Sequence, residues 1–353
     1  MAQIASNLED IDSTEDIIAL ADYMCAENGQ SVVISSGGAR QDDVLKTGSA
    51  HHEFPFKNRA ADGHYRFFSA LRAGFQLSQI LTASKVDVVH LHSQGLIWPV
   101  YIACKLSNKP LIAKVDDPYG GVKHAPISLF KKTPLVTLTQ THKKQLIHLG
   151  VPEALVTVLP PAYNSHLYTP QKTDVDKVDA LWAEWDVPAA TRVVFVPTRC
   201  LEDSAGLDKF IQALAPLKGF PFKAIISGDY SQNQVEFTEL WQQVEHHDLS
   251  KHVLFIGAMV DPTNTYAAAD MVVCPNQYTP PVSRAPLRGQ AMGKPVIASD
   301  LVEHREMVTH EETGWLFSGE NSGKLTEILK KALADNVRLH KMGGKGAKQV
   351  PQI

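Results

Sequence analysis

The sequence predicts an α/β protein made of two doubly wound parallel sheets. Short, nearly continuous apolar runs rich in β-branched residues alternate with helical stretches, as expected for strands that are buried on both faces. The alternation occurs in two series, and a segment rich in proline and polar residues separates them at residues 159–174. Two series of strand–helix units predict two Rossmann-like domains. The 353 residues of the chain are enough for two cores of ordinary size.

The first series of strands and helices covers the N-terminal half of the chain. Its expected strands are residues 31–36, 85–92, 110–115 and 135–139. The clearest helical stretches between them are residues 15–26 and 65–83. We therefore expect residues 1–162 to form the first domain.

The second series repeats the pattern after the break. Its expected strands are residues 192–197, 222–227, 252–257, 271–275 and 295–299. Apolar residues at helical spacing mark two helices, one around Val235, Leu240 and Val244 and one at residues 325–333. We expect residues 163–335 to form the second domain and residues 336–353 to form a basic tail.

The C-terminal end carries a local excess of positive charge. From residue 321 to residue 353 there are seven Lys or Arg and two acidic residues, which gives a net charge of +5. Such a segment could contact anionic lipid or an acidic partner. The alternative is a frayed cationic end.

The overall composition excludes several classes of protein. With 44% hydrophobic residues, 20% charged residues and a formal net charge of −4, the chain has ordinary globular composition. The negative balance gives no general attraction to nucleic acid, and no nucleic-acid-binding signature occurs. The four cysteines lie far apart without a CxxC pair, which indicates neither a metal site nor a disulfide framework. We expect no metal and no cofactor.

The sequence predicts a cytoplasmic location. The first residues are acidic and lack the basic-then-apolar order of a signal peptide. The longest apolar run, residues 95–104, is about half of what a membrane span requires. Peripheral contact with the inner membrane stays open, because the lysine pairs 131–132 and 143–144 flank apolar stretches. Such pairs are more often a solvated face.

One segment, "PPVSRAPLRGQAMGKPVIASD" at residues 280–300, combines an ordinary helix end and strand with an unusual loop. The loop carries three prolines together with Arg284 and Arg288. These arginines are four residues apart and share a helix face if Pro286 lies in the first turn. With Arg199, which follows a strand, they could hold a phosphate bidentately. The alternative is a set of solvent-exposed arginines.

Two further clusters are candidate sites in the first domain. Asp116 and Asp117 could be a paired carboxylate with one member as base or metal ligand, or could cap the turn that follows. His90 and His92 point to one side of a strand and could bind a metal, although packing or lining a cleft is the favoured role. The glycines of "SSGGAR" at residues 35–40 follow a strand, and we interpret them as structural.

Several motifs resemble those of family 4 glycosyltransferases, especially bacterial members that build lipopolysaccharide or capsule. The segment "QAMGKPVIASD", followed by "REMV" (305–308) and "ETGWLF" (312–317), resembles their C-terminal domain. Supporting segments are "VPTR" (196–199), "SGD" (227–229), "IGAMVDPTNTYAAADMVVCP" (256–275) and "VDVVHLHS" (86–93). The resemblance covers nearly the whole chain in order and spacing. It implies the GT-B arrangement, in which a nucleotide-sugar donor is held mainly by the C-terminal domain.

The resemblance also implies roles for particular residues. Leaving-group phosphates need cations, and the family's arginine falls on Arg199 while its lysine falls on Ser204. The family's two glutamates fall on Pro280 and Arg288, and its sugar-facing histidine falls on Asp116. The candidate phosphate- and nucleotide-binding residues are therefore Arg199, Ser204, Gly228, Arg284 and Arg288, and the candidate catalytic residues are Asp116 and Glu306.

Scaffold positions of the family are kept, whereas ligand-contacting positions are replaced. A Gly-Gly loop after the first strand aligns with Ile11 and Asp12, and a glycine of the interdomain linker aligns with Ala162. Charge-assisted hydrogen bonds contribute about 1.5–3 kcal/mol each. Losing a lysine and two carboxylates could therefore remove several orders of magnitude in rate.

The leading hypothesis is a degenerate family member that transfers sugar poorly or not at all. It would be a binding or partner subunit in bacterial cell-surface glycan assembly. The alternative is an active retaining transferase in which Arg284 or Arg288 replaces the absent lysine. A third candidate, a nucleotide-sugar epimerase, would need cleft carboxylates, and the chain shows few.

The expected partners follow from these hypotheses. They are a nucleotide-diphosphate sugar, a glycan or lipid-linked acceptor, and a protein partner or second copy of the chain. Family members usually close with a helix that crosses back onto the first domain. The glycine-rich final residues, "KMGGKGAKQVPQI", lead us to expect that this crossover is absent or that another chain supplies the contact.

Overall fold

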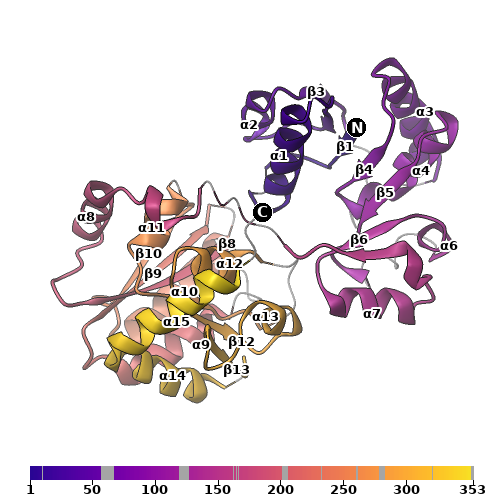
Figure 1. Ribbon diagram of the computed structural model, residues 1–353. Coiled ribbons are helices and arrows are strands. Elements are labelled where there is room, and N and C mark those ends of the chain that lie inside the picture. Colours follow the sequence, from indigo (N-terminus) through magenta and orange to yellow (C-terminus); the bar gives the residue numbers. More distant parts are fainter. Residues whose placement is uncertain are drawn as a thin grey trace. The chain divides into compact units, whose positions relative to one another are not determined.

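The computed structural model divides into two compact units, unit 1 (Met1–Pro161) and unit 2 (Ala162–Ile353). Figure 1 shows both units as sheets covered by helices. The structure describes residues 1–9, 11–56, 67–118, 127–161, 163, 165, 167–200, 206–231, 233–259, 261–277, 283–319 and 321–350.

Unit 1 contains a seven-stranded sheet in the order β3-β2-β1-β4-β5-β6-β7, with every described pair of strands parallel. Its strands are β1 (Ala2–Ile4), β2 (Val32–Ser35), β3 (Ala50–Glu53), β4 (Val89–Leu91), β5 (Leu111–Lys114), β6 (Leu135–Thr137) and β7 (Val156–Val158). Its α-helices are α1 (Ile11–Ala26), α2 (Gln41–Lys46), α3 (Phe67–Ala83), α4 (Ile97–Leu106), α6 (Ile127–Phe130) and α7 (Gln140–His148). Short 3-10 helices are η1 (Gln94–Leu96) and η2 (Glu153–Leu155).

Unit 2 contains a six-stranded parallel sheet in the order β10-β9-β8-β11-β12-β13. Its strands are β8 (Arg192–Cys200), β9 (Phe222–Asp229), β10 (Val253–Gly257), β11 (Met271–Cys274), β12 (Val296–Ser299) and β13 (Gly314–Phe317). Its α-helices are α8 (Val175–Glu184), α9 (Leu207–Leu214), α10 (Gln234–His246), α11 (Pro262–Ala267), α12 (Ala285–Ala291), α13 (Val302–Met307), α14 (Ser322–Ala334) and α15 (Asn336–Gln349). Short 3-10 helices are η3 (Pro170–Lys172) and η5 (Ala215–Leu217).

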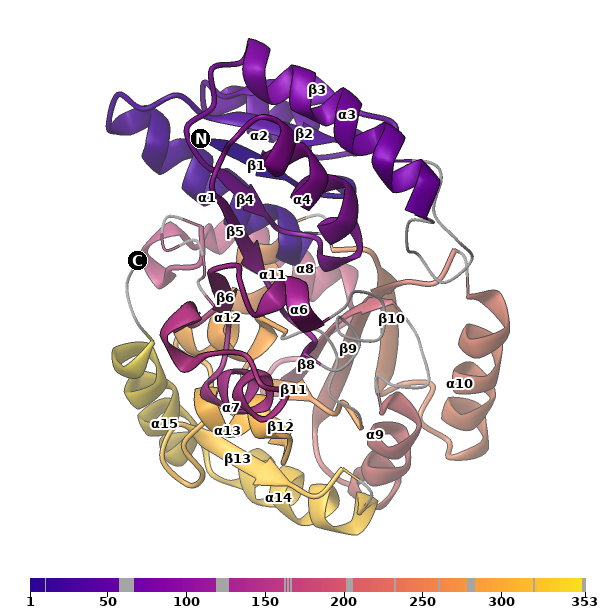
Figure 2. The ribbon, with the colours of Figure 1, turned by 90° about the vertical axis from the view of Figure 1, so that its right-hand side faces the viewer.

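The prediction of two doubly wound α/β domains is confirmed. Each unit has its own core of aliphatic residues between sheet and helices. Every residue of β2, β11 and β12 is buried, which is why these strands are continuous apolar runs in the sequence. In Figure 2, which turns the molecule by 90°, β8, β9 and β10 of unit 2 run side by side, with α9 and α10 beside them.

Three strands of unit 1 were missed, namely β1, β3 and β7. Strands β1 and β3 lack the apolar run, and β7 has only three residues. Strand β1 has only three residues, and its central residue is Gln3. Strand β3 has the sequence AHHE and lies at the edge of the sheet, where three of its four residues are exposed. An edge strand covers little core, so its sequence need not be apolar.

The segment expected as a basic tail is instead a packed helix. Helix α15 begins after Asp335, whose side chain accepts a hydrogen bond from the Arg338 backbone N–H at 2.9 Å. Leu339 and Met342 are buried in the core of unit 2. The glycines let α15 approach α12 and the turn after it: a Cβ on Gly343 would lie 1.9 Å from the carbonyl oxygen of Gly293. Gly343, which looked like part of a flexible chain, is thus required by close packing.

Two adjacent glycines of α15 give opposite predictions. Gly343→Ala should destabilise unit 2 by about 1–3 kcal/mol, because the new methyl group meets rigid backbone. Gly344→Ala should stabilise it by about 0.5–1 kcal/mol, since Gly344 is exposed and a Cβ there meets no described atom within 4 Å. The free energies of unfolding of both variants, measured by urea unfolding, test this prediction. Equal effects would contradict the packing of α15 described above.

Candidate functional site

The strand order of unit 2 reverses between β8 and β11. In doubly wound sheets, ligands bind outside the carboxyl ends of the strands at such a point. Arg199 is the penultimate residue of β8, so its backbone lies at this edge of the sheet. Its side chain, and the whole of Ser204, lie outside the described part of the structure. Their assignment as phosphate ligands therefore stays a prediction.

The start of α9 lies directly against the end of β11. Gly206, the residue before α9, has a φ of +66°, and a Cβ there would be 1.9 Å from the carbonyl oxygen of Pro275. The Gln277 side chain donates a hydrogen bond to Asp208 in the first turn of α9, at 3.2 Å. Only glycine allows this approach. The helix start, the usual place for a nucleotide phosphate in this fold, is therefore preserved.

Gly228, another candidate nucleotide-binding residue, is buried near the end of β9, beside β8. Its φ of +146° is one that residues with a Cβ rarely adopt. The Thr198 hydroxyl of β8 donates a hydrogen bond to the carbonyl oxygen of Ser227. This position thus has a structural reason for glycine, and its role toward a nucleotide stays a prediction.

Arg284 and Arg288 lie on one helix, but they are not exposed. Arg284 immediately precedes α12, Pro286 lies in its first turn, and the Arg288 N–H donates to the Arg284 carbonyl oxygen at 2.9 Å. The exposed fractions of the two arginines are 2% and 6%. For Arg284 and Arg288, the alternative of solvent exposure is therefore wrong.

The Arg288 guanidinium lies against an aromatic cluster of unit 2. Its central carbon is 5.1 Å from the ring centroid of Tyr168, which is 1% exposed. The rings of Tyr168 and Tyr266 pack edge to face, with centroids 5.7 Å apart. The rings of Tyr266 and Phe195 of β8 pack in the same way, with centroids 5.1 Å apart. A planar, weakly hydrated guanidinium suits such a position better than an ammonium group would. Arg288 is thus a buried cation at a position where the resemblance predicts a carboxylate.

On α13, the buried carboxylate is not the one that the sequence indicated. Glu306 is exposed, whereas Glu303 and His304 are 5% and 2% exposed. The Nδ1–H of His304 donates to the carbonyl oxygen of Ser299 at 2.8 Å. Burial lowers the pKa of His304, although this hydrogen bond and Glu303 oppose the shift. Sequence reasoning missed both residues, because the resemblance pointed to Glu306 instead.

In unit 1, a buried lysine connects two carboxylates. Lys114 ends β5 and is 5% exposed. Its Nζ lies 3.0 Å from Asp16 Oδ2, on α1, and 3.2 Å from Asp116 Oδ2. The carboxylates keep side-chain exposures of 22% and 25%. Asp116 is thus an ion-pair partner of Lys114, while Asp117 is exposed.

Lys114 and Asp16 were missed by sequence reasoning. The available signal was the lysine in the apolar strand "PLIAKV" (110–115), because a buried lysine requires a charged partner. The partner Asp16 is 98 positions away and cannot be read from local pattern.

His90 and His92 lie on the same side of β4, as expected, with ring centroids 4.2 Å apart. The His92 ring nitrogen Nε2 is 3.0 Å from Gln3 Oε1, and Gln3 donates to the Ile17 carbonyl oxygen of α1 at 3.0 Å. Burial, together with the nearby charge of Lys114, lowers the pKa of His90 to about 4. Within the described ranges, no group of three or more His, Cys, Asp or Glu is placed to hold a metal ion.

Solved structures of other proteins share this fold. A glycosyltransferase of Rickettsia africae ESF-5 superimposes with a TM-score of 0.87 at 20% identity, covering 99% of this chain and 92% of that one. Anabaena HepE, solved in complex with UDP and glucose, gives a TM-score of 0.83 at 20% identity, covering 99% and 94%. The two parallel-sheet units thus form the GT-B glycosyltransferase fold.

Family comparison assigns the chain more closely. The family described as Glycosyltransferase Family 4 matches residues 17–167, and Glycosyl transferases group 1 matches residues 186–349. The chain therefore belongs to the glycosyltransferases that join these two domains, as the sequence resemblance implied. A stretch of 140 residues is 29% identical to the lipopolysaccharide core biosynthesis mannosyltransferase LpsB of Rhizobium meliloti (strain 1021). That match covers 38% of this chain and 39% of LpsB, so the chain spans about two fifths of that relative.

No helix in the described part of the chain is long and apolar enough to cross a bilayer.

The lowered pKa of His90 predicts a loss of stability in acid. Between about pH 6.5 and pH 4, the unfolded chain binds a proton at this histidine while the folded chain does not, so the free energy of unfolding falls as the pH falls. A pKa lowered from 6.5 to about 4 can contribute up to about 3 kcal/mol to this loss. His90→Gln should therefore show a smaller loss between pH 7 and pH 4 in urea unfolding.

His148, which is exposed at the end of α7, gives the matched control. The variant His148→Gln should keep the wild-type dependence on pH. An unchanged acid dependence in His90→Gln would show that another group governs it.

Proposed function

We propose that this chain is a family 4-type protein of bacterial cell-surface glycan assembly, of the lipopolysaccharide or capsule kind, with weak or lost sugar transfer. Its role would be to bind a glycan or a partner protein in the cytoplasm. The observation that carries the proposal is the burial of Arg288 against Tyr168. This cation stands where the resemblance places a carboxylate that contacts the donor.

Arg288 cannot perform the role of the carboxylate that the resemblance places at its position, and it is not placed to perform the role of the family's lysine either. A guanidinium has five donors and no acceptor, so it cannot accept a hydrogen bond from a ribose or sugar hydroxyl. With 6% of its surface exposed, it is also poorly placed to neutralise a phosphate. Arg284, at 2% exposure, is shielded in the same way. The burial of both residues disfavours the alternative in which one of them replaces the family's lysine.

Unit 1 keeps groups that suit binding of a glycan. Asp16 and Asp116 are held in place by Lys114 and are each about one-quarter exposed. Ionised carboxylates accept hydrogen bonds from sugar hydroxyls, and ones fixed by an ion pair lose little freedom on binding. Asp116 stands where the resemblance places the residue that faces the sugar. Under this proposal, unit 1 thus keeps groups that suit glycan binding, whereas unit 2 lacks groups that suit donor binding.

The family comparison supports the proposed pathway class. LpsB, which shares 29% identity over 140 residues, is described as a lipopolysaccharide core mannosyltransferase. HepE binds UDP and glucose, and a nucleotide-diphosphate sugar is the ligand to test first. A glycan or lipid-linked acceptor is the second ligand class.

The test is turnover with a panel of UDP-, GDP- and ADP-linked hexoses and lipid-linked glycan acceptors. We expect rates at least about a thousandfold below the ordinary range of roughly 1–1,000 per second. An active member of the family, assayed in parallel, controls for the quality of the substrates. Turnover at ordinary rates would refute the proposal.

Ligand binding separates the proposal from the active alternative. A ligand present at one hundred times its Kd stabilises a protein by about 2.7 kcal/mol, which a thermal-shift assay detects. We expect stabilisation by a glycan acceptor and none by UDP or GDP. Micromolar nucleotide binding that is weakened strongly in Arg199→Ala would instead support the active transferase with a rearranged phosphate site.

A further inference from the structure

A cavity of about 370 Å³ lies in unit 2, between α15 and the turn that precedes β13. Figures 1 and 2 both show α15 at the surface of this unit. Binding sites for small molecules usually have volumes of about 300–1,000 Å³, so this space suits a ligand as large as one substituted sugar ring. The charged residues that line the cavity are Glu311, Glu312, Asp335, Arg338, Lys341 and Lys345.

The cavity is separate from the candidate nucleotide site. Glu311 and Glu312 directly precede β13, so they lie toward the amino ends of the strands in this parallel sheet. Arg199, at the end of β8, and Gly228, near the end of β9, lie at the carboxyl ends. A ligand in this cavity therefore does not occupy the candidate donor site.

Helix α15 supplies the positive charge of the cavity. Its sequence contains no acidic residue, and Arg338, Lys341 and Lys345 follow one another at intervals of three and four residues, which places them on one face. Lys341 and Lys345 are exposed, and among the residues that the structure describes no ion pair involves either of them. Like charges at this spacing destabilise a helix, and a bound anion removes that repulsion. An ammonium group binds phosphate as a point charge, so the two lysines can share one phosphate group.

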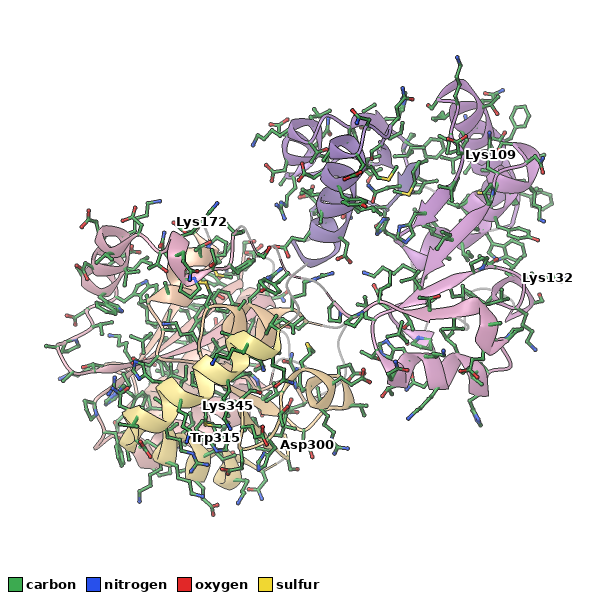
Figure 3. The ribbon with its side chains drawn as sticks, viewed as in Figure 1. Lys109, Lys132, Lys172, Asp300, Trp315 and Lys345 are labelled. Carbon is green, nitrogen blue, oxygen red and sulfur yellow. The ribbon has the colours of Figure 1, made fainter. Side chains whose placement is uncertain are left out.

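Arg338 is held in place on the wall of the cavity. It forms an ion pair with Glu311, and its guanidinium carbon lies 5.3 Å from the ring centroid of Trp315, which is 1% exposed. Figure 3 marks Trp315 and, on α15, Lys345. The Arg338 side chain is still 38% exposed, so a ligand can reach it. A cation fixed in this way loses little freedom when it binds.

Carboxylates line the same cavity and restrict what it can bind. Glu312 is exposed and takes part in no ion pair within the described ranges, while Asp335 accepts a hydrogen bond from the Arg338 backbone N–H at 2.9 Å. Ionised carboxylates only accept hydrogen bonds, so they attract hydroxyl groups and repel phosphates. A surface with phosphates throughout, such as a bilayer or a nucleic acid, is therefore disfavoured. The charges fit a ligand with one anionic group and several hydroxyl groups.

We propose that this cavity binds a phosphorylated monosaccharide, with the phosphate on Lys341 and Lys345 and sugar hydroxyl groups on Glu312. Val337 and Met342, which also line the cavity, offer apolar surface to the C–H groups of the sugar ring. A free sugar phosphate and a phosphorylated residue within a glycan share this chemistry. The cavity lies outside the candidate donor site, so the proposal does not depend on whether the chain transfers sugar.

Isothermal titration calorimetry of the full chain tests the proposal, with mannose 6-phosphate as the probe. We expect saturable binding. Inorganic phosphate and mannose should each bind at least about tenfold more weakly, because each lacks one set of charge-assisted hydrogen bonds. Absence of saturable binding, or equal binding of mannose 6-phosphate and inorganic phosphate, would overturn the proposal.

Two matched double variants locate the site. K341A/K345A should weaken the binding of mannose 6-phosphate by at least about tenfold. K330A/K331A removes the same charge from α14, at lysines outside the cavity lining, and should bind as the wild type does. All four lysines are exposed, so both variants should keep the thermal unfolding midpoint. Equal binding by the two variants would rule out this cavity as the site.

The variant Glu312→Gln tests the contact with the sugar. It removes the charge that strengthens hydrogen bonds from hydroxyl groups and repels phosphate, so the preference for mannose 6-phosphate over inorganic phosphate should fall severalfold. A variant that merely disturbed the packing of unit 2 would weaken both ligands alike. An unchanged ratio of the two Kd values would contradict the assigned role of Glu312.

The methyl glycoside of mannose 6-phosphate distinguishes the two sources of the ligand. If it binds as tightly as the free sugar phosphate, the site accepts a glycosidic bond and a phosphorylated residue within a glycan is the ligand. If it binds at least about tenfold more weakly, the anomeric hydroxyl group is recognised and a free sugar phosphate is the ligand. Both results support the proposed class of ligand.

Discussion

A parallel sheet must be covered on both faces, and this constraint governs which residues the chain keeps. Every connection between parallel strands crosses over a face of the sheet, and the crossover helices must lie close against it. A Cβ on Gly289 of α12 would lie 3.0 Å from Val272 of β11, and one on Gly314 would lie 2.0 Å from the carbonyl oxygen of Val296. Close packing therefore accounts for glycine at positions 289 and 314.

Buried charge obeys a second constraint, and the two units satisfy it in different ways. An ionised group removed from water needs a partner or a polarizable surface. Lys114 lies between two carboxylates, whereas the Arg288 guanidinium lies over the ring of Tyr168. An ammonium is a compact and strongly hydrated charge, while a guanidinium is planar and weakly hydrated. The chain therefore uses lysine where carboxylates are available and arginine where an aromatic face is available.

The sequence predicted the fold because the central strands are apolar on both faces, as in "VVIS" (32–35) and "VIAS" (296–299). Predictions from the sequence failed where the structure depends on packing between distant segments, because a local pattern does not show such packing. The glycines of α15 resembled a flexible tail, yet they allow the helix to approach Gly293. Arg284 and Arg288 were placed on one helix, but helical spacing does not tell which face is buried. The partner of Lys114 comes from α1, far away in the sequence.

The loss of donor chemistry that we propose for unit 2 need not weaken unit 1. The cores of the two units are separate clusters of residues, and each sheet is completed by strands of its own unit. A substitution such as the arginine at position 288 therefore acts on the packing of unit 2, where Tyr168 receives its guanidinium. The carboxylates beside Lys114 belong to unit 1. Under the proposed function, unit 2 would thus lack groups that activate a sugar donor, while carboxylates that suit glycan binding persist in unit 1.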